Sequence, residues 1–96
     1  MEGNEEKYKA FEIKVEGRVQ GVGFRYSAIR TARSLNLTGW VRNEYDGSVS
    51  LFCEGPQDAV NRFIQWCRKG PPGSHVVHMD IIPRTYQKRY SNFGIA

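Results

Sequence analysis

The sequence has no long hydrophobic run, and its 96 residues include only two cysteines and two histidines. The longest apolar runs are far too short to cross a bilayer, so we expect no membrane association. Residues 1–7 are polar and acidic, unlike a signal peptide. We therefore predict a disordered N-terminal lead-in over residues 1–7, followed by one domain over residues 8–96, in the cytoplasm.

Common catalytic and metal-binding patterns are also missing: there is no Cys-x-x-Cys, no carboxylate pair with a plausible third ligand and no Ser/His/Asp set. His75 and His78 fail as a metal pair, because strand positions three apart point to opposite faces. A disulfide needs Cα atoms within ~7 Å. Cys67 lies about 16 Å along a helix from Pro56, whereas Cys53 precedes that proline. We expect two free core thiols in a reducing compartment, no metal and no cofactor.

Positive charge is in moderate excess. The sequence has 14 Lys and Arg against 10 Asp and Glu, a net charge of +4. This balance favours anionic partners, but it suits a phosphate compound and a nucleic acid equally well. The hydrophobic content of 40%, with 12% aromatic residues, is enough for one compact core.

The most informative segment is the run over residues 15–25, Val-Glu-Gly-Arg-Val-Gln-Gly-Val-Gly-Phe-Arg. Glycines let a loop turn its N–H groups inward, and the free N–H groups of a following helix would complete an anion site. Arg25 in the first helical turn adds a planar fork suited to two phosphate oxygens. The segment is neither a Walker loop nor a dinucleotide fingerprint, because the Gly-Lys-Ser/Thr ending is missing and Gly17, Gly21 and Gly23 are wrongly spaced. By itself it fits a tight connection with a solvated Arg25 equally well.

A second segment, over residues 39–49, favours the anion site over a plain tight connection. It reads Gly-Trp-Val-Arg-Asn-Glu-Tyr-Asp-Gly-Ser-Val. Together the two runs closely resemble the acylphosphatase family, whose first motif is aliphatic-x-Gly-x-Val-Gln-Gly-Val-x-Phe-Arg. The family's second motif is Gly-aromatic-Val-basic-Asn-x-x-x-Gly-x-Val. Both motifs lie at the family's usual places, and the resemblance covers almost the whole chain.

Hydrophobic periodicity gives the order of elements. It predicts strands over residues 8–15, 38–44, 48–54, 76–82 and 93–95, with helices from Phe24 to about Leu35 and from Pro56 to the Gly-Pro-Pro-Gly run at 70–73. This order predicts an α+β fold of the ferredoxin-like split βαβ type. The sheet would have four antiparallel strands plus a short C-terminal strand, with both helices on one face. Strands one and two then run parallel on either side of strand three, which brings Arg25 and Asn43 to one edge, about 10 Å apart at the backbone.

The resemblance implies a monomeric, metal-independent hydrolase that acts on acid anhydrides. Its substrates would be small acyl phosphates, cleaved at the carboxyl-phosphate bond to a carboxylate and inorganic phosphate, with sulfate as a phosphate analogue. It also implies two catalytic residues, Arg25 as the phosphate clamp and Asn43 as the group that positions the attacking water. The phosphate loop it implies consists of Gln20, Gly21, Val22, Gly23, Phe24 and Arg25.

Two other functions stay open at this point. An RRM shares the predicted architecture, yet the strand over 48–54 lacks the RNA-binding octapeptide, so we expect no nucleic-acid partner. A catalytically silent anion-binding module is the second alternative, and the presence of Arg25 and Asn43 argues weakly against it. Glu44 and Asp46 are expected to cap the hairpin. Three aromatic residues either form a stacking platform or, more simply, pack the sheet: Trp40, Tyr45 and Phe52.

Overall fold

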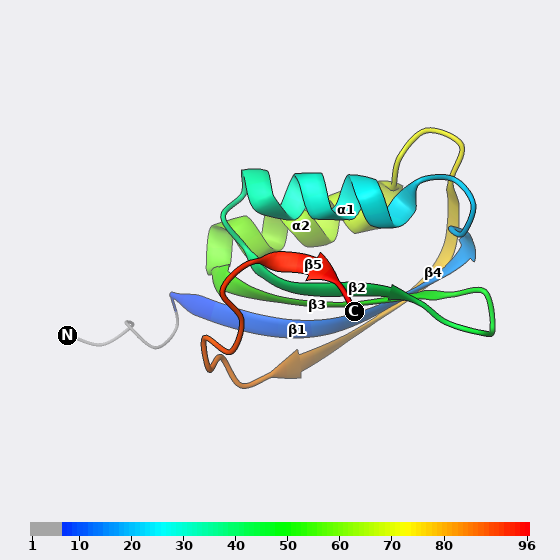
Figure 1. Cartoon of the computed structure of the whole chain (residues 1–96). Coiled ribbons are helices and arrows are strands. Elements are labelled where there is room, and N and C mark those ends of the chain that lie inside the picture. Colours follow the sequence, from blue (N-terminus) through cyan, green and yellow to red (C-terminus); the bar gives the residue numbers. More distant parts are fainter. Residues whose placement is uncertain (1–6) are drawn as a thin grey trace.

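Two helices cover one face of a five-stranded sheet in the computed structural model, which describes residues 7–96 (Figure 1). Except for Lys7, the lead-in predicted over residues 1–7 lies outside the described residues. The elements follow one another as β1 (Tyr8–Arg18), α1 (Phe24–Ser34), β2 (Thr38–Asn43), β3 (Val49–Pro56), α2 (Gln57–Lys69), β4 (His75–Arg84) and β5 (Phe93–Ile95).

The strands are ordered β4-β1-β3-β2-β5. All neighbours are antiparallel except β2 and β5, which pair in parallel. The predicted split βαβ arrangement is therefore confirmed, with β3 between β1 and β2. The two strands β1 and β4 run longer than predicted, because they pair with each other as far as Arg18 and His75, past a register shift between Glu16 and Gly17. Polar residues at these strand ends interrupt the alternation of apolar and polar positions from which the strand bounds were predicted.

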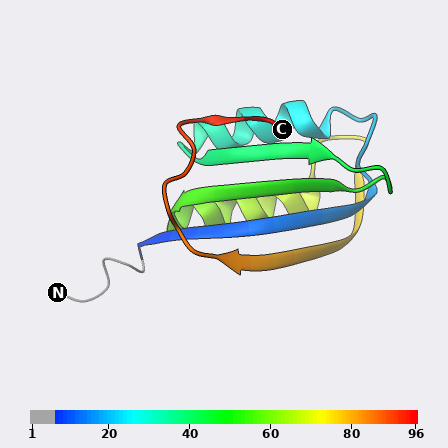
Figure 2. The same ribbon diagram turned by 60° about the horizontal axis from the view of Figure 1, so that its bottom comes forward.

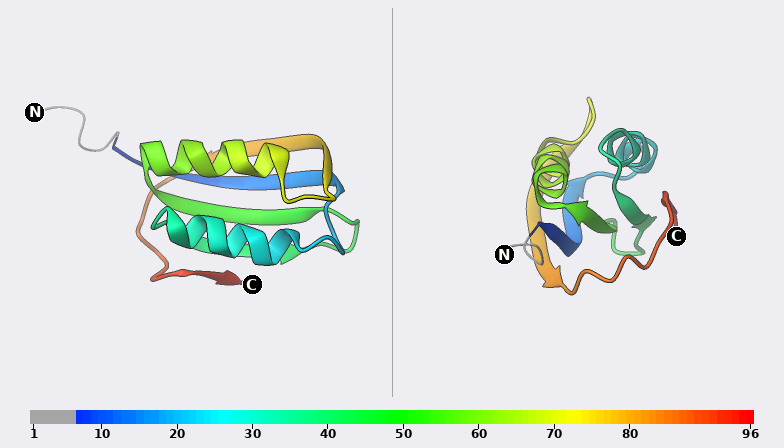
Figure 3. Two further views of the ribbon diagram at one scale, coloured as in Figure 1. Left: turned by 90° about the horizontal axis from the view of Figure 1, so that it is seen from above. Right: turned by 90° about the vertical axis from the view of Figure 1, so that its left-hand side faces the viewer.

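The core lies between the sheet and the helices, which Figure 3 shows side by side on one face. It includes Ile13 and Val15 of β1, Val41 of β2, Val49, Leu51 and Cys53 of β3, Phe24, Ala28 and Ala32 of α1, Val60, Phe63 and Cys67 of α2, and Phe93 of β5. These residues repeat every second position on strands and every third or fourth on helices, as a buried face requires. One continuous apolar layer thus holds the two helices against the sheet.

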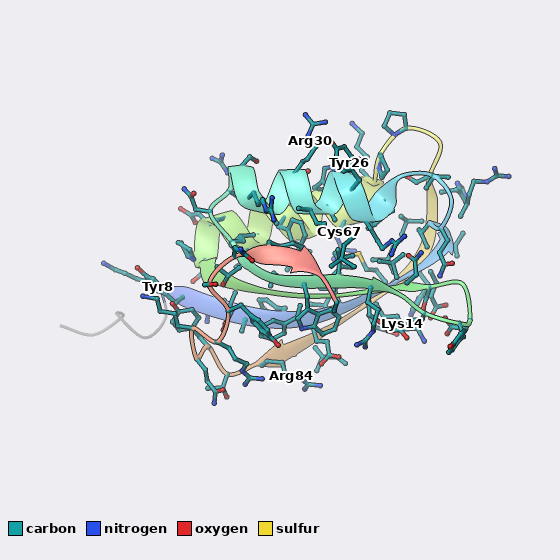
Figure 4. All side chains as sticks on the ribbon, in the orientation of Figure 1. Tyr8, Lys14, Tyr26, Arg30, Cys67 and Arg84 are labelled. Carbon is teal, nitrogen blue, oxygen red and sulfur yellow. The ribbon has the colours of Figure 1, made fainter. Side chains whose placement is uncertain are left out.

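Both cysteines are buried and free, as predicted. Burial raises the pKa of Cys53 to about 12, and burial followed by the charge of Cys53 raises the pKa of Cys67 well above its usual value. Figure 4 places Cys67 between the helices and the sheet.

The chain from β4 to β5 crosses the face of the sheet that the helices leave open. Figure 2 shows this segment, residues 85–92, passing near the end where β1 begins. Glu54 of β3 holds it in place. Its side chain is only 1% exposed, and its two carboxylate oxygens accept hydrogen bonds from the N–H groups of Gln87 (3.1 Å) and Arg89 (2.7 Å). The crossing delivers β5 to the edge beside β2.

Aromatic packing on the open face explains the residues considered above as a platform. The rings of Trp40 and Phe52 stack with centroids 6.4 Å apart, and Tyr90 packs its edge against Phe52 at 5.6 Å. Phe52 is only 5% exposed, whereas Tyr45 lies apart from the stack and is fully exposed. The aromatic residues therefore present no continuous stacking surface. No helix in residues 7–96 has the length and apolar character to traverse a membrane.

Candidate active site

The loop over residues 19–23 connects β1 to α1 and depends on two glycines. Gly21 has φ 76° and Gly23 has φ 78°, both in the left-handed region. A Cβ atom at either position would meet nothing within 4 Å, so the requirement for glycine is conformational and not steric. Gly23 is the N-cap of α1 and gives it no side-chain cap, so the first N–H groups of the helix keep their hydrogens available.

Consecutive backbone N–H groups at this loop find no acceptor in the described part of the chain. Within residues 7–96, the N–H groups of residues 20–26 donate no hydrogen bond, and the first helical bond runs from the N–H of Ser27 to the carbonyl of Gly23 at 3.0 Å. Free N–H groups at a helix N-terminus attract an anion, both as donors and through the helix dipole. The loop thus has a run of free donors, as the predicted anion site would require.

A cavity of about 240 Å³ opens at this loop. It is lined by Val19, Gln20, Gly21, Gly23, Phe24, Arg25, Tyr26, Ile29, Asn43 and Ile95. Arg25 comes from the first turn of α1, and Asn43 from the end of β2, so the fold brings both to the edge where the topology predicted them. Within the described part of the chain, neither side chain makes a hydrogen bond or an ion pair, and both are partly exposed. Both are therefore available to a ligand.

The side chain of Gln20 has a role that the sequence did not suggest. Its Nε2 donates to the backbone carbonyl oxygens of Glu44 and Ser48, each at 2.8 Å. These two residues belong to the connection between β2 and β3, directly after Asn43. Gln20 thus ties the loop to the hairpin that carries Asn43, while its own N–H stays free. The only signal for this in the sequence is the fixed place of a glutamine within the first motif.

The hairpin itself is held by a carboxylate, as predicted. Asp46 Oδ1 accepts hydrogen bonds from the N–H (3.0 Å) and the hydroxyl (2.6 Å) of Ser48, and its Oδ2 lies 3.0 Å from Lys14 Nζ. These contacts, those of Ser48 first, hold the pKa of Asp46 far below its usual value. The hydroxyl of Ser50 and the guanidinium of Arg42, whose Nε donates to Glu44 Oε2 at 2.9 Å, likewise lower the pKa of Glu44. Both carboxylates thus have structural partners in the hairpin and do not line the cavity.

Two other features are set apart from this cavity. His75 and His78 are exposed on β4, and His78 Nε2 lies 2.9 Å from Asp80. No group of three or more His, Cys, Asp or Glu side chains in residues 7–96 is arranged to hold a metal ion. A larger, open hollow of about 720 Å³ lies between α1, α2 and the loop before β4, but neither Arg25 nor Asn43 lines it. The smaller cavity is therefore the candidate site.

The fold and this cavity define a class of protein, a ferredoxin-like sandwich with a cavity at the first strand-to-helix loop. Residues 11–95 match the family model Acylphosphatase, so the chain belongs to the acylphosphatase family. Proteins named acylphosphatase from Burkholderia ambifaria and Methylococcus capsulatus are 38% and 42% identical to it, over 93% and 91% of this chain and 91% and 95% of theirs. The solved structure of an acylphosphatase from Coxiella burnetii superposes over 100% of both chains with a TM-score of 0.90 at 33% identity.

Proposed function

We propose that residues 8–96 form one catalytic domain that hydrolyses small acyl phosphates to a carboxylate and inorganic phosphate. The observation that carries this proposal is that Arg25, Asn43 and the loop line one cavity, at which the N–H groups of residues 20–26 have no acceptor in the described part of the chain. Of the predicted site residues, only Val22 does not line the cavity, because its side chain packs against the core. Family membership supports the same activity, because the relatives described above are named acylphosphatases.

In the proposed mechanism, the loop N–H groups from Gln20 to Phe24 and the Arg25 guanidinium hold the phosphoryl oxygens. Charge on these oxygens is spread in the transition state of phosphoryl transfer, so donors fixed in advance lower the barrier. Gln20 and the αL conformation of Gly23 keep these donors in place before substrate arrives.

Asn43 is proposed to orient the attacking water. Its amide offers both a donor and an acceptor, so it can accept a hydrogen bond from water while donating to a phosphoryl oxygen. The opposite face of the phosphoryl group is then left to the departing carboxylate. A carboxylate leaves without protonation, so the mechanism needs no general acid and no metal ion. Phosphate is the second product, and sulfate should occupy the same loop.

We further propose that the protein acts as a monomer in the cytoplasm. The cavity is assembled from α1, β2, β5 and the loop before α1 of a single chain, so no residue from a second copy is required to build it. The two cysteines are unpaired, in keeping with a reducing compartment.

The test is release of phosphate from acetyl phosphate by the purified protein, with and without EDTA. We expect hydrolysis that EDTA does not change. Arg25→Ala should lower kcat/KM by roughly 10³-fold, and Arg25→Lys should also lower it, because lysine keeps the charge but not the planar fork. Arg62→Ala is the matched control, because it removes one positive charge from an exposed position on α2, and it should keep wild-type activity. A wild-type kcat/KM in folded Arg25→Ala would overturn the clamp.

Thermal unfolding gives a second measurement that does not depend on turnover. Phosphate bound by the native loop should raise the Tm of the wild type as its concentration increases. The Arg25→Ala protein should show a much smaller rise. An equal rise in both proteins would place the anion elsewhere on this basic surface.

A further inference from the structure

The lining of the site cavity divides into a polar and an apolar part. The loop, Arg25 and Asn43 account for the polar groups assigned above to the phosphoryl end of the substrate. Of the apolar lining residues, Val19 and Phe24 are buried in the core. Three large side chains outside the buried core remain without a role in that assignment: Tyr26 and Ile29 of α1 and Ile95 of β5. Within the described residues, no acidic side chain lines this cavity.

Two of these side chains are strongly exposed. Tyr26 is 67% and Ile95 is 61% exposed. Single exposed apolar residues are common and carry no meaning alone. Here, however, the two come from different elements and line the same small cavity, together with the partly buried Ile29. A ligand that reaches past the phosphate loop would cover apolar surface that is otherwise in water.

The placement of Ile95 beside α1 is fixed by hydrogen bonds. Arg33 of α1 donates from Nε to the carbonyl of Phe93 at 3.0 Å, and the N–H of Ala96 donates to the carbonyl of Val41 at 3.0 Å. These bonds fasten β5 to α1 on one side and to β2 on the other. Tyr26 is also held, because the Arg30 guanidinium lies 5.7 Å from its ring centroid, and Figure 4 shows both residues on α1.

We propose that Tyr26, Ile29 and Ile95 form the subsite for the acyl group, and that this subsite favours apolar acyl chains over the acetyl group. The inference rests on the proposed function, since it concerns the other end of the same substrate. With the phosphoryl group in the loop, the acyl carbon chain leaves the cavity across these side chains. Each methylene group that becomes buried against them adds binding energy.

The experiment compares butanoyl phosphate with acetyl phosphate. The two carboxylate leaving groups have closely similar basicity, so a difference in kcat/KM reports contacts of the two added methylene groups and not intrinsic reactivity. For the wild type we expect kcat/KM to be about three- to tenfold higher for butanoyl phosphate, less than for full burial of two methylene groups, because the rim is open to solvent.

The decisive variant is the double substitution Tyr26→Ala with Ile95→Ala. Both positions are exposed, so the fold should be kept, and circular dichroism checks this. We expect the ratio of the two kcat/KM values to fall to about one, because kcat/KM for butanoyl phosphate should fall much further than kcat/KM for acetyl phosphate. Tyr26→Phe should keep the wild-type ratio, because it keeps the ring. Ile82→Ala removes an exposed apolar side chain from β4, outside the cavity, and should leave the ratio unchanged.

Two outcomes would overturn the inference, and they differ from failure of the proposed function. A wild-type ratio near one means that the acyl chain does not contact this surface. An unchanged preference for butanoyl phosphate in the double variant means that another part of the protein contacts the chain. If the wild type hydrolyses neither compound, the proposed function itself is wrong, and the subsite is wrong with it.

Discussion

The polar groups at the two ends of the sheet differ in whether they have hydrogen-bond partners. At the end that carries the loop, Arg25, Asn43 and the N–H groups of residues 20–26 have no partner within the described part of the chain. At the other end, Glu54 is buried and both of its oxygens accept backbone hydrogen bonds. Arg25 and Asn43 are partly exposed, so water can pair with them in the free protein. In the proposed function, the phosphoryl group of the substrate replaces that water.

The contrast separates function from stability. A side chain without protein partners contributes little to folding, so its removal should change activity and leave the fold intact. A buried carboxylate with two donors behaves in the reverse manner, because its removal leaves those donors unsatisfied. The comparison between the ends can therefore be tested by measuring activity and stability on the same variants.

After the Arg25 variants, the largest effect is expected from Asn43→Ala. If Asn43 orients the water, its loss acts on the chemical step and should lower kcat by roughly 10²–10³, the range seen when one preorganised polar group is removed. Inhibition by phosphate should weaken far less. The Tm should be close to that of the wild type, because the side chain has no hydrogen bond to another described residue. Steady-state kinetics and thermal unfolding on one preparation check both statements.

The pH dependence of the wild type tests the same role of Asn43. An amide does not titrate and an arginine side chain stays protonated, so kcat should be nearly flat from about pH 5.5 to 8. Asn43→Asp should also be slow, since a carboxylate would face the phosphoryl charge. A bell-shaped profile centred near neutrality, or normal kcat in the alanine variant, would indicate that an acid–base group performs the chemistry.

At the opposite end, Glu54→Ala should lower the free energy of unfolding by about 2–3 kcal/mol, the value expected when donors to a buried charged group lose their acceptor. Because Glu54 lies away from the cavity, kcat of the folded variant should be unchanged. Urea denaturation and kinetics together measure the two quantities. Glu12→Gln is the control, because Glu12 forms an exposed ion pair with Arg84 (3.0 Å). Loss of this ion pair should lower the free energy of unfolding by less than ~1 kcal/mol. Equal stability of the Glu54 and Glu12 variants would remove the contrast.

Much of the fold could be predicted from local sequence signals. The alternation of Ile13 and Val15, the helical spacing of Phe24, Ala28 and Ala32, and the proline before α2 each fix an element locally. The order of these elements then leaves few topologies, and the split βαβ arrangement brings Arg25 and Asn43 to one edge. Placement of these two residues was thus predictable because it follows from strand order alone.

Long-range contacts between polar side chains and the backbone could not be predicted. Gln20 donates to carbonyl groups 24 and 28 positions away in sequence, and Glu54 accepts from N–H groups 33 and 35 positions away. A polar residue carries no periodic signal that names such a partner. The apolar subsite of Tyr26, Ile29 and Ile95 could not be predicted for a similar reason. Ile95 reaches the cavity only because residues 85–92 cross the sheet, and no local sequence signal indicates that crossing.

The smallest expected effect concerns Asp46, which has partners but lies beside the site. Because its pKa is lowered in the folded protein, its charge stabilises the fold above the unfolded pKa of about 4. That contribution is lost as the pH falls through the lower folded value. Asp46→Asn keeps an oxygen for Ser48 but removes the charge toward Lys14. The wild type should therefore have a slightly higher Tm than this variant at pH 6, and the difference should shrink steadily toward pH 2.

The pKa of Lys14 is raised by the same ion pair, so the difference in Tm should also shrink as the pH rises beyond about 10. Glu16→Gln removes a partly exposed carboxylate that has no hydrogen bond or ion pair within residues 7–96, so it should show a weaker dependence on pH. A Tm difference for Asp46→Asn that stays constant from pH 6 to pH 2 would mean that the hairpin is held by turn geometry alone and not by the charge.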